Sequence, residues 1–296
     1  MKQYLITILF TSLLAIGQVG AQNHPDFKQG KQQLAHKNYE AAVTSFKKAA
    51  KAEPNNENNY LWLGHAYSRR MSQVSNFMKK GMLARKMKNA YQKAVAIAPN
   101  SIDARYSLAM YYINAPAIAG GSTAKAKAQA EEVIKLDKGK GYDLLATIYQ
   151  AKKEYAAAEA AYRKCLRFSD RQSKVYYKLG MLLQTQKKYV RAFQELGRAI
   201  QKDNNYLNAY YQYARTAVFA QMHTSKGIQY LRYYVGKASA NNSKIVAPTY
   251  AWWRMGQLYE LEQDTIKARQ AYQKALALNP KNKQAKAALE KLKETE

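Results

Sequence analysis

The chain has 296 residues, with 48 lysines and arginines against 20 aspartates and glutamates, and a formal net charge of +28. Its single cysteine, Cys165, excludes an intramolecular disulfide framework, so stability has to come from packing. A positive excess of this size favours anionic partners, at least non-specifically, although a basic surface that only keeps the chain soluble has the same composition.

The first 21 residues have the pattern of a secretory signal peptide. Lys2 gives a positive start, residues 4–16 form an uncharged apolar run, and small residues end at Ala21. The apolar run is shorter than the ~20 residues that a membrane-spanning helix needs. We predict export to the periplasm or the extracellular space, with cleavage after Ala21 and no transmembrane segment afterwards. The alternative is an uncleaved N-terminal anchor.

The rest of the sequence repeats itself every 34 residues, as the pairs Gly30 and Gly64 and Ala146 and Gly180 illustrate. A fixed period of this length indicates one supersecondary unit that is stacked many times. Residues 283–296 form a charged amphipathic segment that we expect to be a helix capping the last repeat. The predicted array covers residues 22–282, with repeats near 23–56, 57–101, 102–138, 139–172, 173–206, 207–248 and 249–282.

The residues within each repeat resemble the tetratricopeptide repeat. That motif has a bulky residue, then Leu and Gly or Ala, then Tyr in a first helix, followed by Ala, an aromatic residue, Ala and Pro in a second helix. The seventh repeat carries Trp252, Met255, Gly256, Tyr259, Ala268, Tyr272, Ala275 and Pro280 at these positions. The resemblance implies an all-α fold, a right-handed α-solenoid of seven helix hairpins with a C-terminal capping helix.

Three insertions interrupt the array. The first, near residues 68–80, is followed by Met82 and carries Phe77 and Met78 at helical spacing, which predicts that one helix is longer by about three turns. We expect these apolar residues, with Val74, to add to the core. The alternative is a basic, methionine-bearing surface that contacts a partner.

The second insertion, residues 114–122, is apolar. We expect Pro116 to end a helix, Gly120 and Gly121 to form a turn, and Ser122 or Thr123 to cap the next helix. The third, residues 235–248, is polar and predicts a longer loop, with a hinge as one possible role.

The charge is unevenly distributed along the chain. Residues 58–102 and 204–259 contain no acidic residue, while acids gather between Glu131 and Glu195 and again after Glu260. These two acid-free segments are the candidates for contact with an anionic partner.

The resemblance also implies a binding surface. In the tetratricopeptide family the first helix of each repeat lines a concave groove, and its second, fifth, ninth, twelfth and thirteenth positions contact ligands. In this chain those positions form an aromatic ladder flanked by positive charge, although fifth-position aromatics also pack against the next helix in such arrays. The candidate partner-binding residues are Phe27, Lys31, His65, Arg69, Tyr106, Met110, Lys140, Lys174, Tyr177, Met181, Tyr211, Arg215, Trp253 and Gln257.

No catalytic pattern accompanies the repeat. The four histidines lie far apart in the register, and no metal-ligand spacing, nucleophile motif or phosphate-binding loop is present. We therefore predict a protein that is not an enzyme and that uses no cofactor or metal.

Three hypotheses for its role follow. The first is an exported scaffold that binds an unidentified envelope protein or peptide, because aromatic rings beside arginine suit interface hot spots. The second is a binder of an anionic envelope polymer, and the third is a structural assembly subunit. We do not expect nucleic acid as a partner of an exported chain. Salt separates the first two, because polyanion binding weakens log-linearly with salt.

Overall fold

The computed structural model describes residues 24–238 and 245–294, and within these ranges all regular elements are helical. The predicted signal peptide and part of the third insertion lie outside the described residues. The chain divides into two compact units, Met1–Glu154 and Tyr155–Glu296. The division falls inside the predicted fourth repeat, where the sequence pattern shows no interruption.

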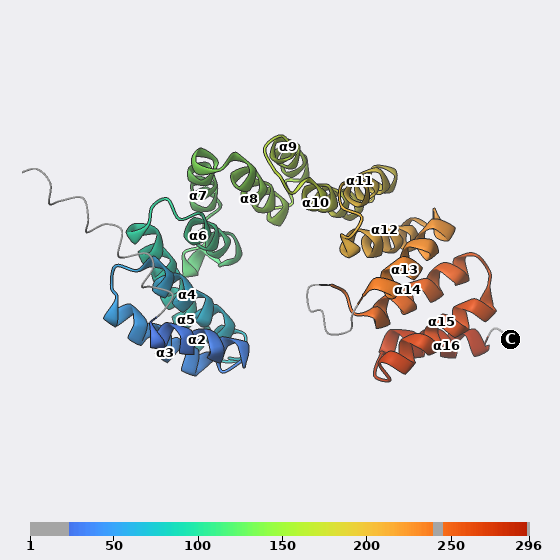
Figure 1. Ribbon diagram of the computed structural model, residues 1–296, viewed down its shortest axis with the longest axis horizontal. Helices are drawn as coiled ribbons and strands as arrows, with labels where there is room; N and C mark the ends of the chain where they lie inside the picture. The colour runs from blue at the N-terminus through green and yellow to red at the C-terminus, as the bar shows by residue number, and fades with distance from the viewer. Residues whose placement is uncertain (1–23, 239–244, 295–296) are drawn as a thin grey trace, which may run out of the picture. The chain divides into compact units, whose positions relative to one another are not determined.

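Unit 1 is a series of helices in which each packs against its neighbours in the sequence (Figure 1). The pairs α2–α3, α4–α5 and α6–α7 form antiparallel hairpins, and α8 follows them. The helices of unit 1 are α2 (Pro25–Ala35), α3 (Tyr39–Ala52), α4 (Glu57–Met71), α5 (Phe77–Ile97), α6 (Ile102–Asn114), the short 3-10 helix η2 (Ala117–Ala119), α7 (Thr123–Leu136) and α8 (Lys138–Ala151).

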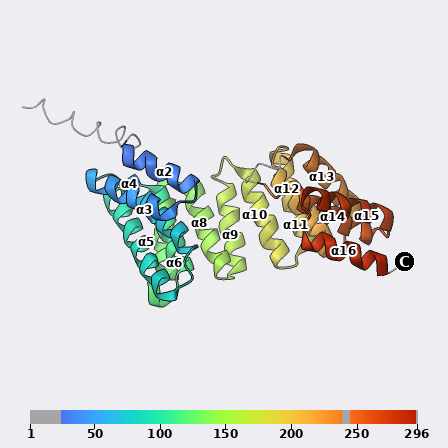
Figure 2. The ribbon, with the colours of Figure 1, turned by 90° about the horizontal axis from the view of Figure 1, so that it is seen from below.

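Unit 2 follows the same plan, with α9 preceding the hairpins α10–α11, α12–α13 and α14–α15 (Figure 2). The last helix, α16, packs on α15 and buries Ala285 and Leu292 against it, as expected of a cap. The helices of unit 2 are α9 (Tyr155–Leu166), α10 (Gln172–Thr185), α11 (Tyr189–Lys202), α12 (Leu207–Ala220), α13 (Thr224–Lys237), α14 (Pro248–Leu261), α15 (Thr265–Leu278) and α16 (Lys283–Glu294).

A glycine facing a large aromatic ring lies at the contact between the two helices of the α4–α5 hairpin and of the α14–α15 hairpin. A Cβ atom added to Gly64 in α4 would lie 2.2 Å from the ring of Tyr91 in α5, and one added to Gly256 in α14 would lie 2.3 Å from the ring of Tyr272 in α15. Both rings are buried. The glycine and the aromatic residue of the motif are therefore two halves of one contact, which explains why both recur at the same period.

The turn inside the hairpins is also regular. Lys37, Lys153, Lys187 and Gln263 adopt φ angles between 58° and 62°, in the left-handed region. A left-handed residue after a helix lets later amide groups donate back to its last carbonyl groups. The amide of Lys188 donates to the carbonyl of Leu183 at 2.9 Å in this way. The first helix therefore ends with its backbone groups satisfied, without a glycine.

The first insertion lengthens α5, which has 21 residues where α3, α7, α11, α13 and α15 have 14. The lengthening is about two turns rather than three, because the remaining residues extend the α4–α5 connection. The expectation that its apolar residues are core is wrong for Phe77, Met78 and Met82, which are 82%, 78% and 49% exposed. The 15-residue α4 is too short to cover the added turns. Val74 does pack against the core.

The second insertion forms a braced loop between α6 and α7. The α6 helix ends at Asn114, directly before Ala115 and Pro116, and the hydroxyl of Ser122 caps α7 by accepting from the amide of Lys125 at 3.3 Å. Gly120 has a φ of 88°, a conformation that favours glycine. The loop therefore has a defined shape despite its apolar composition.

Among the described residues, no helix combines the length and the apolar character needed to cross a membrane.

Candidate partner-binding sites

The predicted contact residues fall into both units. Unit 1 holds Phe27, Lys31, His65, Arg69, Tyr106, Met110 and Lys140, and unit 2 holds Lys174, Tyr177, Met181, Tyr211, Arg215, Trp253 and Gln257.

Two rings of the predicted aromatic ladder belong to the core. Phe27 is 3% exposed and packs edge-on against Phe46, with ring centroids 5.6 Å apart. Tyr211 is 8% exposed and lies against Tyr234 at 5.7 Å. These two positions correct the ladder, because their rings fill the space between helices and leave little surface for a partner.

Four charged candidates, Lys31, Arg69, Lys140 and Lys174, lie at the surface. The ammonium group of Lys31 is 4.5 Å from the ring centroid of Trp62, and that of Lys140 is 3.6 Å from the carboxylate of Asp137. Arg69 and Lys174 are exposed, and Met181 is half-buried.

In unit 2 the structure brings several candidates together around two guanidinium groups. The Cζ atoms of Arg215 in α12 and Arg254 in α14 each lie 5.2 Å from the ring centroid of Phe219. Arg254 also lies 4.2 Å from the ring centroid of Trp253, and its Nη1 donates to Oε1 of Gln257 at 2.8 Å. We call Arg215, Phe219, Trp253, Arg254 and Gln257 the arginine–aromatic cluster.

Among the described residues, no acidic side chain forms an ion pair with the two guanidinium groups of the cluster. Arg215 and Arg254 are half-buried, and the Nε atom of each is buried without a hydrogen-bond partner in the described structure. The ion pairs described in unit 2 are formed by other residues, among them Arg163 and Lys267. Burial lowers the pKa of Arg254, and the nearby charge of Arg215 lowers it further, while Tyr211 opposes the shift. The arrangement favours an anionic group from outside.

Tyr177 in α10 lies beside this cluster. Burial raises the pKa of its hydroxyl, and the positive charge of Arg215 opposes that rise. Its ring packs edge-on against Tyr206, with centroids 5.3 Å apart. Tyr177 therefore offers a half-buried ring next to a guanidinium group.

In unit 1 a pocket of about 1300 Å³ lies between α4, α5, α6 and the loop of the second insertion. Three predicted residues, His65, Tyr106 and Met110, line it. We call it the apolar pocket, because methionines and aromatic rings dominate its lining. These side chains are Met71, Phe77, Met78, Met82, Met87, Tyr91, Tyr106, Met110 and Tyr111.

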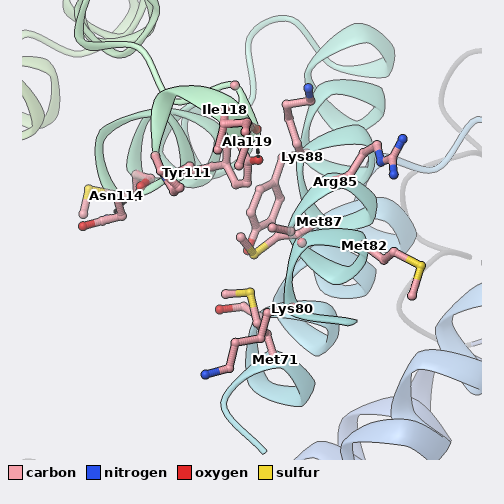
Figure 3. Close-up of a pocket in the computed structure, with 18 of the residues that line it drawn as sticks. Met71, Lys80, Met82, Arg85, Met87, Lys88, Tyr111, Asn114, Ile118 and Ala119 are labelled. Atoms are coloured by element: carbon pink, nitrogen blue, oxygen red, sulfur yellow. Dashed lines mark hydrogen bonds between the residues drawn. The ribbon is translucent and has the colours of Figure 1, made fainter. Parts of the chain in front are cut away.

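The first and the second insertion therefore both contribute to the apolar pocket. Figure 3 shows Met87 of α5 facing Tyr111 of α6, with Lys88 extending toward the loop at Ile118 and Ala119. The hydroxyl of Tyr111 donates to the carbonyl oxygen of Ala119 at 2.5 Å and holds the loop in place. The loop adds Ile118, whose side chain is 94% exposed, to the rim.

His65 is half-buried at the edge of the apolar pocket, with its Nδ1 3.0 Å from the hydroxyl of Tyr91. Burial lowers the pKa of His65 below its ordinary value of 6.5, and the charge of Arg69 lowers it further. Since the unfolded chain then binds the proton more tightly, the folded state is favoured above pH 6.5 and loses stability as the pH falls below it.

We expect this loss to be smaller in His65→Gln, which has no titrating group at this position. Urea unfolding of both proteins between about pH 5 and pH 8 measures it. Equal pH profiles would show that His65 is not responsible.

Sequence reasoning missed two residues of the arginine–aromatic cluster. Phe219 occupies the thirteenth position of the first helix in the sixth repeat, so the same mapping extended to that repeat identifies it. Arg254 follows the fifth position, where the family pattern has no contact residue. The absence of acidic residues is a second sequence signal that points to both sites. Much of the apolar pocket comes from the acid-free segment 58–102, and the cluster lies in the acid-free segment 204–259.

No group of three or more histidines, cysteines or acidic residues is arranged to hold a metal ion in the part of the chain that the structure describes. Cys165, the single cysteine of the chain, is buried. Its position in the core favours an inert thiol.

Helix hairpins that pack on their sequence neighbours define an α-solenoid, and comparison with known proteins agrees. The tetratricopeptide repeat model matches residues 139–171 and 249–282. These two matches identify residues 139–171 and 249–282 as tetratricopeptide repeats, in agreement with the repeat pattern of the sequence. No curated protein sequence matches it.

Solved structures share the fold at low sequence identity. The C-terminal part of a repeat-containing protein of Cytophaga hutchinsonii matches with a TM-score of 0.54 at 18% identity, covering 89% of this chain and 99% of that one. A tetratricopeptide repeat protein of Parabacteroides merdae gives 0.53 at 15% identity, covering 90% and 96%. The pilF protein of Pseudomonas aeruginosa gives 0.54 at 15% identity, covering 81% and 97%.

Proposed function

We propose that this chain is an exported, non-enzymatic scaffold that binds a protein or peptide of the cell envelope, in the periplasm or outside the cell. Members of this repeat family act as protein-interaction scaffolds, and solenoid surfaces suit extended partners. The proposal of export rests on the charged start and apolar run of residues 1–21.

The observation that carries the proposal is the arginine–aromatic cluster of unit 2. Two half-buried guanidinium groups without acidic partners lie against Phe219 and Trp253, where a peptide carboxylate and an adjacent apolar side chain would be bound together. Arginine and tryptophan at the centre of a surface are the residues that most often dominate binding energy. Tyr177 and Gln257 add a ring and a polar contact at its edges.

The test is a pull-down from native envelope extract with residues 22–296 as bait, washed at low and high salt. We expect Arg215→Ala with Arg254→Ala to weaken capture of the partner about tenfold or more, because charged hydrogen bonds contribute roughly 1.5–3 kcal/mol each. The control is Lys202→Ala with Lys237→Ala, which removes the same charge from exposed positions of unit 2.

The second candidate, a binder of an anionic polymer, rests on the acid-free segments and the net charge of +28. It predicts that both double variants lose capture equally and that capture falls log-linearly with salt. That result would contradict the scaffold proposal. A partner retained in high salt by the wild type and the control, and lost by the arginine variant, would support it.

A further inference from the structure

Several large apolar side chains around the apolar pocket of unit 1 are exposed and are not covered by another helix. The added turns of α5 carry the exposed residues Phe77, Met78 and Met82, and the facing loop carries Ile118. Neighbouring exposed apolar side chains around a concavity mark an interaction site. These exposed residues belong to the two inserted regions, so the regular repeat does not account for them.

The dimensions of this surface suit a helix. The lining residues of α5 run from Phe77 to Tyr91. At 1.5 Å per residue they extend over about 20 Å, the length of a helix of about 14 residues. A volume of about 1300 Å³ exceeds a typical small-molecule site, and flexible methionines adapt to the side chains of a docked helix.

Basic residues border the same surface. Lys80, Arg85 and Lys88 line the pocket, and its lining contains no acidic residue. The ion pairs described in unit 1 are formed by other residues, among them Arg70, Arg105 and Lys127. Lys80, Arg85 and Lys88 form no ion pair with any residue that the structure describes. They are spread over about two turns of α5, so they match several acidic residues along a segment better than a single anionic headgroup.

We propose that the apolar pocket is a docking site for an acidic amphipathic helix of a partner protein. The apolar face of that helix lies in the pocket against Met78, Met82 and Met110, and acidic residues beside the apolar face pair with Lys80, Arg85 and Lys88. This site goes beyond the proposed function, because it lies in the other unit and uses none of the residues of the arginine–aromatic cluster.

The probes are two synthetic helical peptides of about 14 residues. Both carry leucines and phenylalanines at helical spacing, with glutamates at the flanking positions of one and lysines at the same positions of the other. Binding to residues 22–296 is followed by the fluorescence anisotropy of the labelled peptide. We expect saturable binding of the glutamate peptide and at least about tenfold weaker binding of the lysine peptide.

Two variants test the pocket. Met78→Glu with Met82→Glu places negative charge in the apolar surface. This variant is expected to bind the glutamate peptide at least about tenfold more weakly than the wild type does. Lys80→Glu with Lys88→Glu is expected to reverse the preference, so that the lysine peptide binds better. Reversal is not explained by misfolding, and circular dichroism checks that both variants fold. Ile266→Glu in unit 2 is the control, since its side chain is 72% exposed and far in sequence from the pocket.

Several outcomes would overturn the proposal. One is no saturable binding of the glutamate peptide, and another is equal binding of both peptides. A third is binding of phosphatidylglycerol vesicles that the pocket variants abolish while the peptides do not bind, which would make the site a lipid site. A dimer in sedimentation that the methionine variant dissociates would assign the surface to a second copy. We expect Arg215→Ala with Arg254→Ala to leave binding of the glutamate peptide unchanged, so that failure of this proposal and failure of the proposed function can be distinguished.

Discussion

Replacement of Phe46 by alanine is expected to lower the free energy of unfolding of unit 1 by about 3–5 kcal/mol. The side chain is fully buried and packs against two other rings, with its centroid 5.6 Å from that of Phe27 and 6.3 Å from that of Trp62. It also fills the space left by Gly30, where an added Cβ would lie 2.8 Å from the ring. Removal of the ring therefore leaves a cavity at the contact of three helices.

Phe77→Ala is the matched control, because it deletes the same ring from a side chain that is 82% exposed. Its effect on stability is expected within about 0.5 kcal/mol. Urea unfolding followed by circular dichroism measures both variants. Similar losses in the two would show that burial at Phe46 does not set the stability of this hairpin.

Replacement of Gly141 by leucine is expected to destabilise the chain by about 3 kcal/mol, the upper end of the usual cost of overpacking. Gly141 lies in α8 at its crossing with α7, and an added Cβ would lie 2.4 Å from the backbone nitrogen of Ile134. A side-chain obstacle can rotate away, whereas this obstacle is the backbone of a packed helix. The two helices have to separate to admit the new side chain.

Gly236→Leu in α13 makes the same replacement in open space, with no heavy atom within 4 Å of the added Cβ. It is expected to stabilise the protein by about 0.5 kcal/mol through helix propensity alone. Thermal unfolding of both variants gives the comparison. A stable Gly141→Leu protein would mean that α7 and α8 adjust more easily than their packing indicates.

The regular part of the fold was readable from the sequence because one contact recurs. Gly64 with Tyr91 and Gly256 with Tyr272 repeat the same small-to-large pairing, so the period reports the hairpin directly. The expectation for α5 was wrong for a physical reason. Helical spacing of Phe77, Met78 and Met82 identifies a common region of one helix, but it does not show whether another helix covers that region.

The candidate sites were predictable only in part. His65, Tyr106 and Met110 were named from their positions in the first helices, and they line the apolar pocket. Most of that pocket comes from α5, which the first insertion lengthens, and from the α6–α7 loop, which the second insertion forms. Neither addition has a counterpart in the repeat. In unit 2 the sequence mapping included Arg215 and Trp253 and omitted Arg254, because the contact of Arg254 with Phe219 depends on how α12 and α14 pack.

Packing between sequence neighbours also bears on how such a chain can change in evolution. Gly64 contacts Tyr91 within one hairpin, and Gly256 contacts Tyr272 within another. The contact that holds the two helices of such a hairpin together therefore lies within that hairpin. The enlarged α4–α5 hairpin shows that one repeat can acquire new residues while this contact is kept. Gene segments encoding single hairpins can therefore be lengthened or duplicated, and new surface can arise without a redesign of the remaining core.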